Sequence, residues 1–170
     1  MGAALTIAIR IANSANAILQ RVKTFDQGDL HNNEEWDMRA HIGIEPMLLA
    51  LSMELALKAW FVFDYDTPEV IRSHNLSKLF ASLKPESQDK LDFEFRQSVA
   101  LLHPNIFYID YGIKNVLEQH ENAFVDWRYI YEAENITFDK SAFTATLEML
   151  LSEFKKRYRI EEVSPILPSE

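Results

Sequence analysis

Apolar residues recur at the spacing of an α-helix along most of this chain. The first such stretch, from about residue 3 to residue 23, predicts an amphipathic helix. A second, from about Glu45 to Phe63, is apolar nearly all round, which is typical of the central helix of a bundle. Pro46 suits the first turn of that helix. Residues 26–41 are polar and contain Gly28 and two asparagines, so we expect a loop there.

Shorter apolar patterns predict further helices at about residues 76–83, 85–103, 113–120 and 122–132, and a last one from residue 140. Asn75 and Asp139 stand where residues that cap helix N-termini are found. Phe138 and Phe143 have the spacing of a hydrophobic staple across the second of these caps. The segment 105–112, NIFYIDYG, has strand-like residues, but a single strand has nothing to pair with, so we expect an extended, packed loop.

The predicted fold class is therefore all-α, a single-domain bundle of about five to seven helices over residues 1–162 with a flexible tail at 163–170. Composition agrees, because 48% of the residues are hydrophobic and only four are glycine. There are no cysteines, which excludes disulfides and thiol chemistry and fits a cytoplasmic protein. No stretch has the ~18 uninterrupted apolar residues of a membrane span, so we expect no membrane partner.

Glu54 and Lys58 are the only charges within the apolar run from residue 47 to residue 63. A charge in such a run needs a partner, so we expect Glu54 to be buried and paired with Lys58 or Arg128. The alternative is a pocket for a nucleotide phosphate. His74, directly before a predicted helix, has either a structural or a catalytic role.

The segment from Ala123 to Glu132 has an aromatic face at helical spacing, formed by Phe124, Trp127 and Tyr131. We expect this face to lie in the core. Arg128 shares it and would be drawn beside the core, where a guanidinium needs a carboxylate or carbonyl partner.

The net charge of −9 disfavours general affinity for nucleic acid, except through a local basic patch. The one basic run, residues 155–159, is either the positively charged last turn of a helix or a phosphate-binding patch. The five histidines show no metal-binding spacing, so we predict no metal site and no cofactor.

Three segments in order carry a resemblance to a known family: LALSMELALKAW, IRSHNLSKLF and AFVDWRYIYE, between Met47 and Glu132. Together they resemble the HEPN family of small helical domains in bacterial conflict and nucleotide-linked systems. The resemblance implies a helical bundle, a homodimer, and a module that binds a partner protein, a nucleotide or RNA. The partner protein would be of the nucleotidyltransferase or antitoxin type, as in toxin–antitoxin pairs.

The family's active members cleave RNA without metal, using an Arg and a His separated by four to six residues. Arg96 and His103 have this spacing, so the alternative function is a metal-independent endoribonuclease in which Arg96 steadies a phosphate and His103 moves protons. Gln97 and Pro104 depart from the family's pattern at the positions that follow each residue. The resemblance therefore favours a binding module without a clear catalytic motif.

Overall fold

The computed structural model describes residues 2–25, 35–129 and 137–163, and within them the chain is helical with no strand. This confirms the predicted all-α bundle. The helices are α1 (Ala3–Lys23), α2 (Glu35–Tyr65), α3 (Leu76–Ala81), α4 (Pro85–Leu102), α5 (Ile113–Gln119), α6 (Ala123–Arg128) and α7 (Lys140–Val163).

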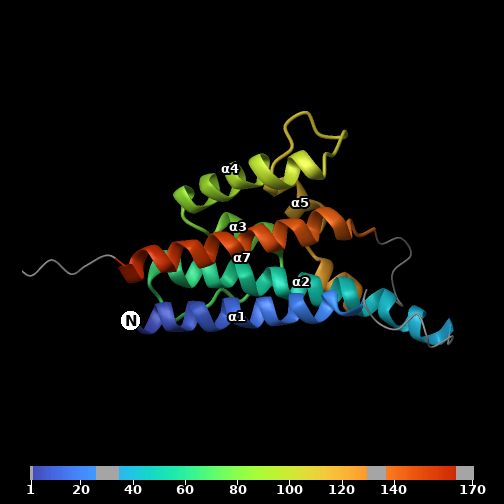
Figure 1. The fold of residues 1–170 in the computed structure, drawn as a ribbon, viewed down its shortest axis with the longest axis horizontal. Helices are drawn as coiled ribbons and strands as arrows, with labels where there is room; N and C mark the ends of the chain where they lie inside the picture. The colour runs from blue at the N-terminus through green and yellow to red at the C-terminus, as the bar shows by residue number, and fades with distance from the viewer. Residues whose placement is uncertain (1, 26–34, 130–136, 164–170) are drawn as a thin grey trace, which may run out of the picture.

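The central helix, α2, packs against α1, α3, α6 and α7. Figure 1 shows α1, α2 and α7 running side by side, with α4 beyond α7 on the side away from α1. Trp60 of α2 is fully buried, and its indole N–H donates to the Leu150 carbonyl of α7 at 3.1 Å. The stretch Gly43–Tyr65 is long and apolar enough to cross a membrane, but most of it is buried inside the bundle, as in the core helix of a soluble protein.

Small residues allow α1 to lie close to α2. The buried face of α1 repeats alanine every three or four residues, at Ala4, Ala8, Ala12 and Ala15. Side chains this small let two helix backbones approach closely. The Ser52 hydroxyl of α2 donates to the Ala15 carbonyl at 2.7 Å, which requires that short separation. The N-terminal helix is thus fixed along the length of the central one.

Helix α2 begins at Glu35, about ten residues before the predicted start, and Pro46 lies inside it and not in its first turn. The loop predicted at residues 26–41 is therefore wrong for residues 35–41, because the polar residues in this stretch were interpreted as a loop. Residues 35–41 alternate charged and apolar side chains and contain no glycine or proline, so nothing in them breaks a helix. The breakers, Gly28 and the two asparagines, lie outside the described residues.

Both predicted N-caps are confirmed. The Asn75 side chain accepts from the Lys78 N–H at 2.9 Å, and Asp139 accepts from the Ala142 N–H at 3.1 Å. The rings of Phe138 and Phe143 lie 4.8 Å apart between centroids, across the start of α7. A flexible tail was predicted at residues 163–170. Val163 is instead the last residue of α7, and the rest of the predicted tail lies outside the described residues.

The aromatic face of α6 is less buried than predicted. Phe124 and Trp127 are half-buried, Arg128 is exposed, and Ala123 is the fully buried residue of this helix. The reason is that α6 has six residues and packs mainly against α2, so only one of its sides is covered. Tyr131 lies outside the described residues.

The loop between α4 and α5, residues 103–112, is not packed as predicted. Ile106, Phe107 and Ile109 are 91%, 89% and 108% exposed. Tyr111 instead takes the packing position against Phe95, with ring centroids 5.3 Å apart, and the three apolar side chains are left in solvent. In Figure 1 the loop projects from the top of the molecule.

A buried histidine joins the end of α5 to the start of α7. The His120 Nδ1–H donates to the Val116 carbonyl at 2.8 Å, and Nε2 accepts from the Asp139 N–H at 3.0 Å. These partners require a neutral ring with its proton on Nδ1. Burial lowers the pKa of His120, against smaller opposing effects of the Val116 carbonyl and the Asp139 charge.

We expect acid to destabilise the fold through His120. Its pKa is lower in the folded chain, so from about pH 6.5 downward the unfolded chain binds a proton that the folded chain resists. The stability that the neutral ring supplies is present above that pH and is lost as the pH falls. In His120→Gln, the melting temperature should fall less steeply over this range than in the unmodified chain. Equal slopes for the two proteins would contradict this role.

Candidate functional site

A buried carboxylate on α2 holds two basic side chains at one place. Glu54 is 3% exposed; its Oε1 accepts from Lys58 Nζ at 2.5 Å and its Oε2 from His74 Nδ1 at 2.9 Å. Lys58 comes from the next turn of α2, and His74 from the segment that joins α2 to α3. The structure thus brings together three of the four residues predicted to form a polar network.

The ring of His74 is held in one orientation although it faces solvent. Its side chain is 59% exposed, and the ring stacks on Phe124 of α6 with centroids 5.2 Å apart. Glu54 fixes the Nδ1 edge and Phe124 covers one face, so the Nε2 edge is the part left open. A carboxylate bound to Nδ1 is also the arrangement that fixes a histidine's tautomer at sites where Nε2 accepts or donates a proton.

An open cavity of about 520 Å³ adjoins this pair. Its walls are Lys58 and the segment Val70–His74. Arg72 of this segment is exposed. Sequence reasoning missed Arg72, because nothing in an extended connecting segment marks which of its side chains will face a cavity.

Arg128, the fourth residue of the predicted network, does not join Glu54. It is exposed, and its guanidinium carbon lies 5.2 Å from the centroid of the Tyr129 ring. The partners of the two Glu54 oxygens are Lys58 and His74.

Arg96 of the predicted catalytic pair is bound by two carboxylates. Its Nε donates to Asp92 Oδ2 at 2.6 Å, and its Nη1 pairs with Asp110 in the exposed loop. The hydrogen bonds to Asp110 and Asp92 raise the pKa of the guanidinium above its already high ordinary value. Asp92 also accepts from the Ile113 N–H at 3.0 Å, so Arg96 ties the end of the loop and the start of α5 to α4.

His103 ends α4 and turns toward another helix. Its Nδ1 lies 3.1 Å from the Ser141 hydroxyl at the start of α7. The two residues of the predicted catalytic pair therefore have separate partners in the structure. Arg96 pairs with Asp92 and Asp110, whereas His103 contacts Ser141.

The basic run at residues 155–159 contains a structural arginine. Arg157 Nη1 donates to Asp64 Oδ1 at 2.8 Å, and its guanidinium lies over the ring of Phe63 at 4.7 Å. Asp64 is buried and also accepts from the Ser87 hydroxyl at 2.7 Å. Arg157 thus joins α7 to α2 and α4, and neither of the two sequence interpretations of the run anticipated this.

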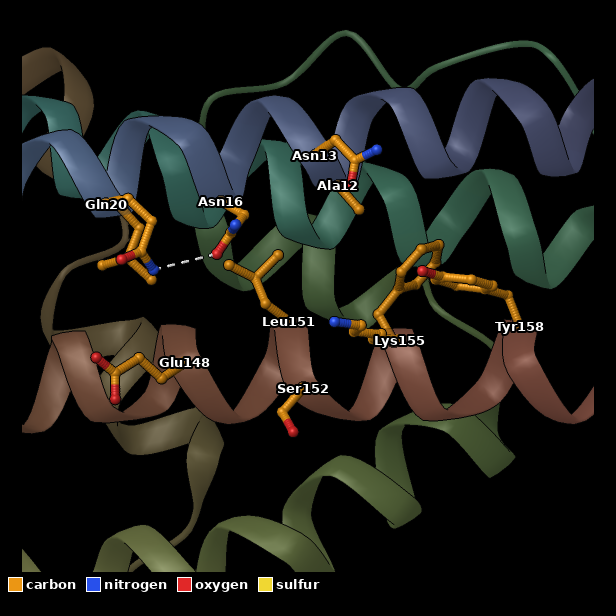
Figure 2. Close-up of a pocket in the computed structure, with 11 residues that line it drawn as sticks. Ala12, Asn13, Asn16, Gln20, Glu148, Leu151, Ser152, Lys155 and Tyr158 are labelled. Atoms are coloured by element: carbon orange, nitrogen blue, oxygen red, sulfur yellow. Dashed lines mark hydrogen bonds between the residues drawn. The ribbon is translucent and has the colours of Figure 1, made fainter.

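A second cavity, of about 400 Å³, lies between α1 and α7. Figure 2 shows its side chains, with Asn16 and Gln20 from α1 facing Glu148 and Lys155 from α7. Gln20 donates to Asn16 at 3.3 Å. The walls of this cavity carry one acidic and one basic side chain, so the cavity presents no net charge to a ligand. Among the described residues, no three His, Asp or Glu side chains are grouped as metal ligands.

Comparisons of the chain with family models, with curated proteins and with solved structures found no match.

The buried pair on α2 should be essential to stability. Glu54→Ala leaves the largely buried Lys58 ammonium without its carboxylate, which should cost about 3–5 kcal/mol of unfolding free energy. Replacing both residues, in Glu54→Leu with Lys58→Met, should recover much of that loss because no buried charge remains unpaired. Urea unfolding followed by circular dichroism measures both. A double variant as unstable as Glu54→Ala would show that the charge pair is not the cause.

Proposed function

We propose that this chain is a HEPN-like bacterial helical module that functions by binding another protein chain in the cytoplasm. The observation that carries the proposal is the exposure of five apolar side chains close together in the chain, at the end of α4 and in the loop after it, which we call the apolar patch: Leu101, Leu102, Ile106, Phe107 and Ile109. The order of the Glu54, His74 and Arg128 segments along the chain supports the HEPN-like part, and the lack of cysteines supports the cytoplasm.

Five large apolar side chains within nine residues are more than a monomer ordinarily exposes in one place. Each of the five is at least 72% exposed. Monomeric soluble proteins rarely expose contiguous apolar patches above a few hundred Å², and larger ones mark interaction sites. The Arg96–Asp110 salt bridge and the Ile113 N–H that donates to Asp92 both tie the end of the loop to α4, which reduces the entropy that the loop would lose on binding.

The occupant that the charges favour is a second copy of the chain. The segment from Leu101 to Ile109 contains no acidic, lysine or arginine residue, whereas the chain as a whole has a net charge of −9. Two copies would repel each other over most of their surface. At this segment they could meet without bringing like charges face to face. A basic partner would be drawn to the acidic surface instead. A symmetric dimer, in which the patch covers itself, fits these constraints.

The dimer can be tested with a matched pair of substitutions. Ile106→Asp places a charge in the patch and should convert a dimer to a monomer with an unchanged helical spectrum. Ile44→Asp adds the same charge at an isoleucine on α2 that is 43% exposed, and it should remain a dimer. Sedimentation equilibrium and circular dichroism measure the two properties. An unmodified chain that is monomeric at high micromolar concentration would contradict a self-association function.

A metal-independent endoribonuclease using Arg96 and His103 is the second candidate. It is favoured by the position of His103, which adjoins the patch, so that a dimer formed there would bring the histidines of the two copies toward one another. It is disfavoured by Arg96, whose guanidinium would have to release two carboxylates before it held a phosphate. The binding function is therefore the better supported of the two.

We expect purified protein to leave both structured and single-stranded RNA intact. Cleavage that persists in EDTA and is lost in Arg96→Ala and in His103→Ala, with both variants folded, would establish the ribonuclease instead. Gel electrophoresis of end-labelled RNA measures it. Cleavage that survives both substitutions would indicate a contaminating nuclease.

A further inference from the structure

We propose that the cavity of about 400 Å³ between α1 and α7 binds an extended segment of another protein through the main chain of that segment. The cavity is a groove with one wall on α1, from Ala12 to Gln20, and the other on α7, from Glu148 to Tyr158. At 1.5 Å per helical residue these walls are about 12–15 Å long, which is the length of about four extended residues. The groove is separate from the apolar patch, because α4 lies on the other side of α7 (Figure 1).

Side-chain amides line the α1 wall at intervals of about one helical turn. Asn13, Asn16 and Gln20 are exposed and lie on one face of α1. Each amide has a carbonyl acceptor and two N–H donors, which match the N–H and the C=O of a peptide group. The hydrogen bond from Gln20 to Asn16 leaves both amides with further donors and acceptors. Main-chain groups on one side of an extended segment recur about every 6.6 Å, close to the helical pitch of about 5.4 Å.

Apolar side chains form the floor between the two walls. Ala12, Leu19 and Phe154 are buried, and Leu151 is half-buried. Figure 2 shows Leu151 and Lys155 projecting from α7 into the space between the helices. Successive side chains of an extended segment point to opposite faces. Every second side chain of a bound segment would therefore meet this floor while the main chain meets the amides, so we expect apolar residues at alternate positions of the ligand.

The chemistry of the groove favours an extended segment over a helix or a nucleic acid. A helix satisfies its main-chain groups internally, so it would leave the row of amides without main-chain partners. Nucleic acid is held mainly by lysine and arginine on its phosphates. Among the described residues, the walls of the groove carry one acidic and one basic side chain, and Lys23 pairs with the acidic one, Glu148, at one end. A neutral peptide main chain needs no excess of positive charge.

The test uses the full chain and an uncharged peptide, acetyl-Thr-Leu-Thr-Leu-Thr-amide, in which threonine favours an extended chain and leucine occupies alternate positions. In two-dimensional NMR spectra of the isotope-labelled protein, the peptide should shift the side-chain amide signals of Asn13, Asn16 and Gln20. Asn16→Ala should weaken the affinity about fivefold, which is the contribution of one neutral hydrogen bond. The helical spectrum should be kept, because alanine favours a helix more than asparagine does.

Gln97→Ala provides the matched control, because it removes an exposed side-chain amide from α4, which does not line the groove. Its affinity for the peptide should equal that of the unmodified chain. A second control is the same peptide with methylated main-chain nitrogens, which keeps every side chain but loses the N–H donors and should bind about tenfold more weakly or less. Equal affinities for the two peptides would overturn main-chain recognition. Equal losses in Asn16→Ala and Gln97→Ala would overturn the site, and so would an absence of amide shifts at millimolar peptide.

Discussion

The arrangement of this molecule depends on the burial of α2, because each acidic side chain along its core face must be neutralised where it lies. Transferring a lone carboxylate from water into a protein interior costs several kcal/mol, so such a group is paired, hydrogen-bonded or absent. Glu54 and Asp64 are 3% and 4% exposed. Each is satisfied by groups from other parts of the chain, and those partners determine how the surrounding elements are placed.

Asp64 determines the placement of the outer helices. Its Oδ2 accepts from the Lys84 N–H at 3.0 Å and its Oδ1 from the Ser87 hydroxyl, so it serves as the cap that α4 lacks in its own sequence. Arg157 of α7 neutralises the same carboxylate. One buried charge thereby fixes α4 and α7 relative to α2. The far end of α4 carries the exposed apolar loop, which Arg96 then holds in place.

Local chemistry was readable from the sequence, and chemistry between distant residues was not. The caps at Asn75 and Asp139 act over three residues, and the Glu54–Lys58 pair lies within one helical turn. His74 meets Glu54 across 20 residues and Arg157 meets Asp64 across 93. Nothing in a single sequence selects those partners from among the 17 lysines and arginines and five histidines of this chain.

The exposed loop between α4 and α5 is a second feature that the sequence did not predict. Apolar and aromatic residues at 105–111 were expected to be buried, since burial is where such residues gain most free energy. In the structure, Tyr111 takes the available position against Phe95, and the neighbouring isoleucines and phenylalanine remain outside. A sequence pattern indicates that residues are apolar, but not whether the fold has a position in which to bury each of them. Ile106, Phe107 and Ile109 stay exposed on a loop whose end is tied to α4 by the Arg96–Asp110 salt bridge, so the position of each side chain, and not its apolar character alone, decides whether it is buried.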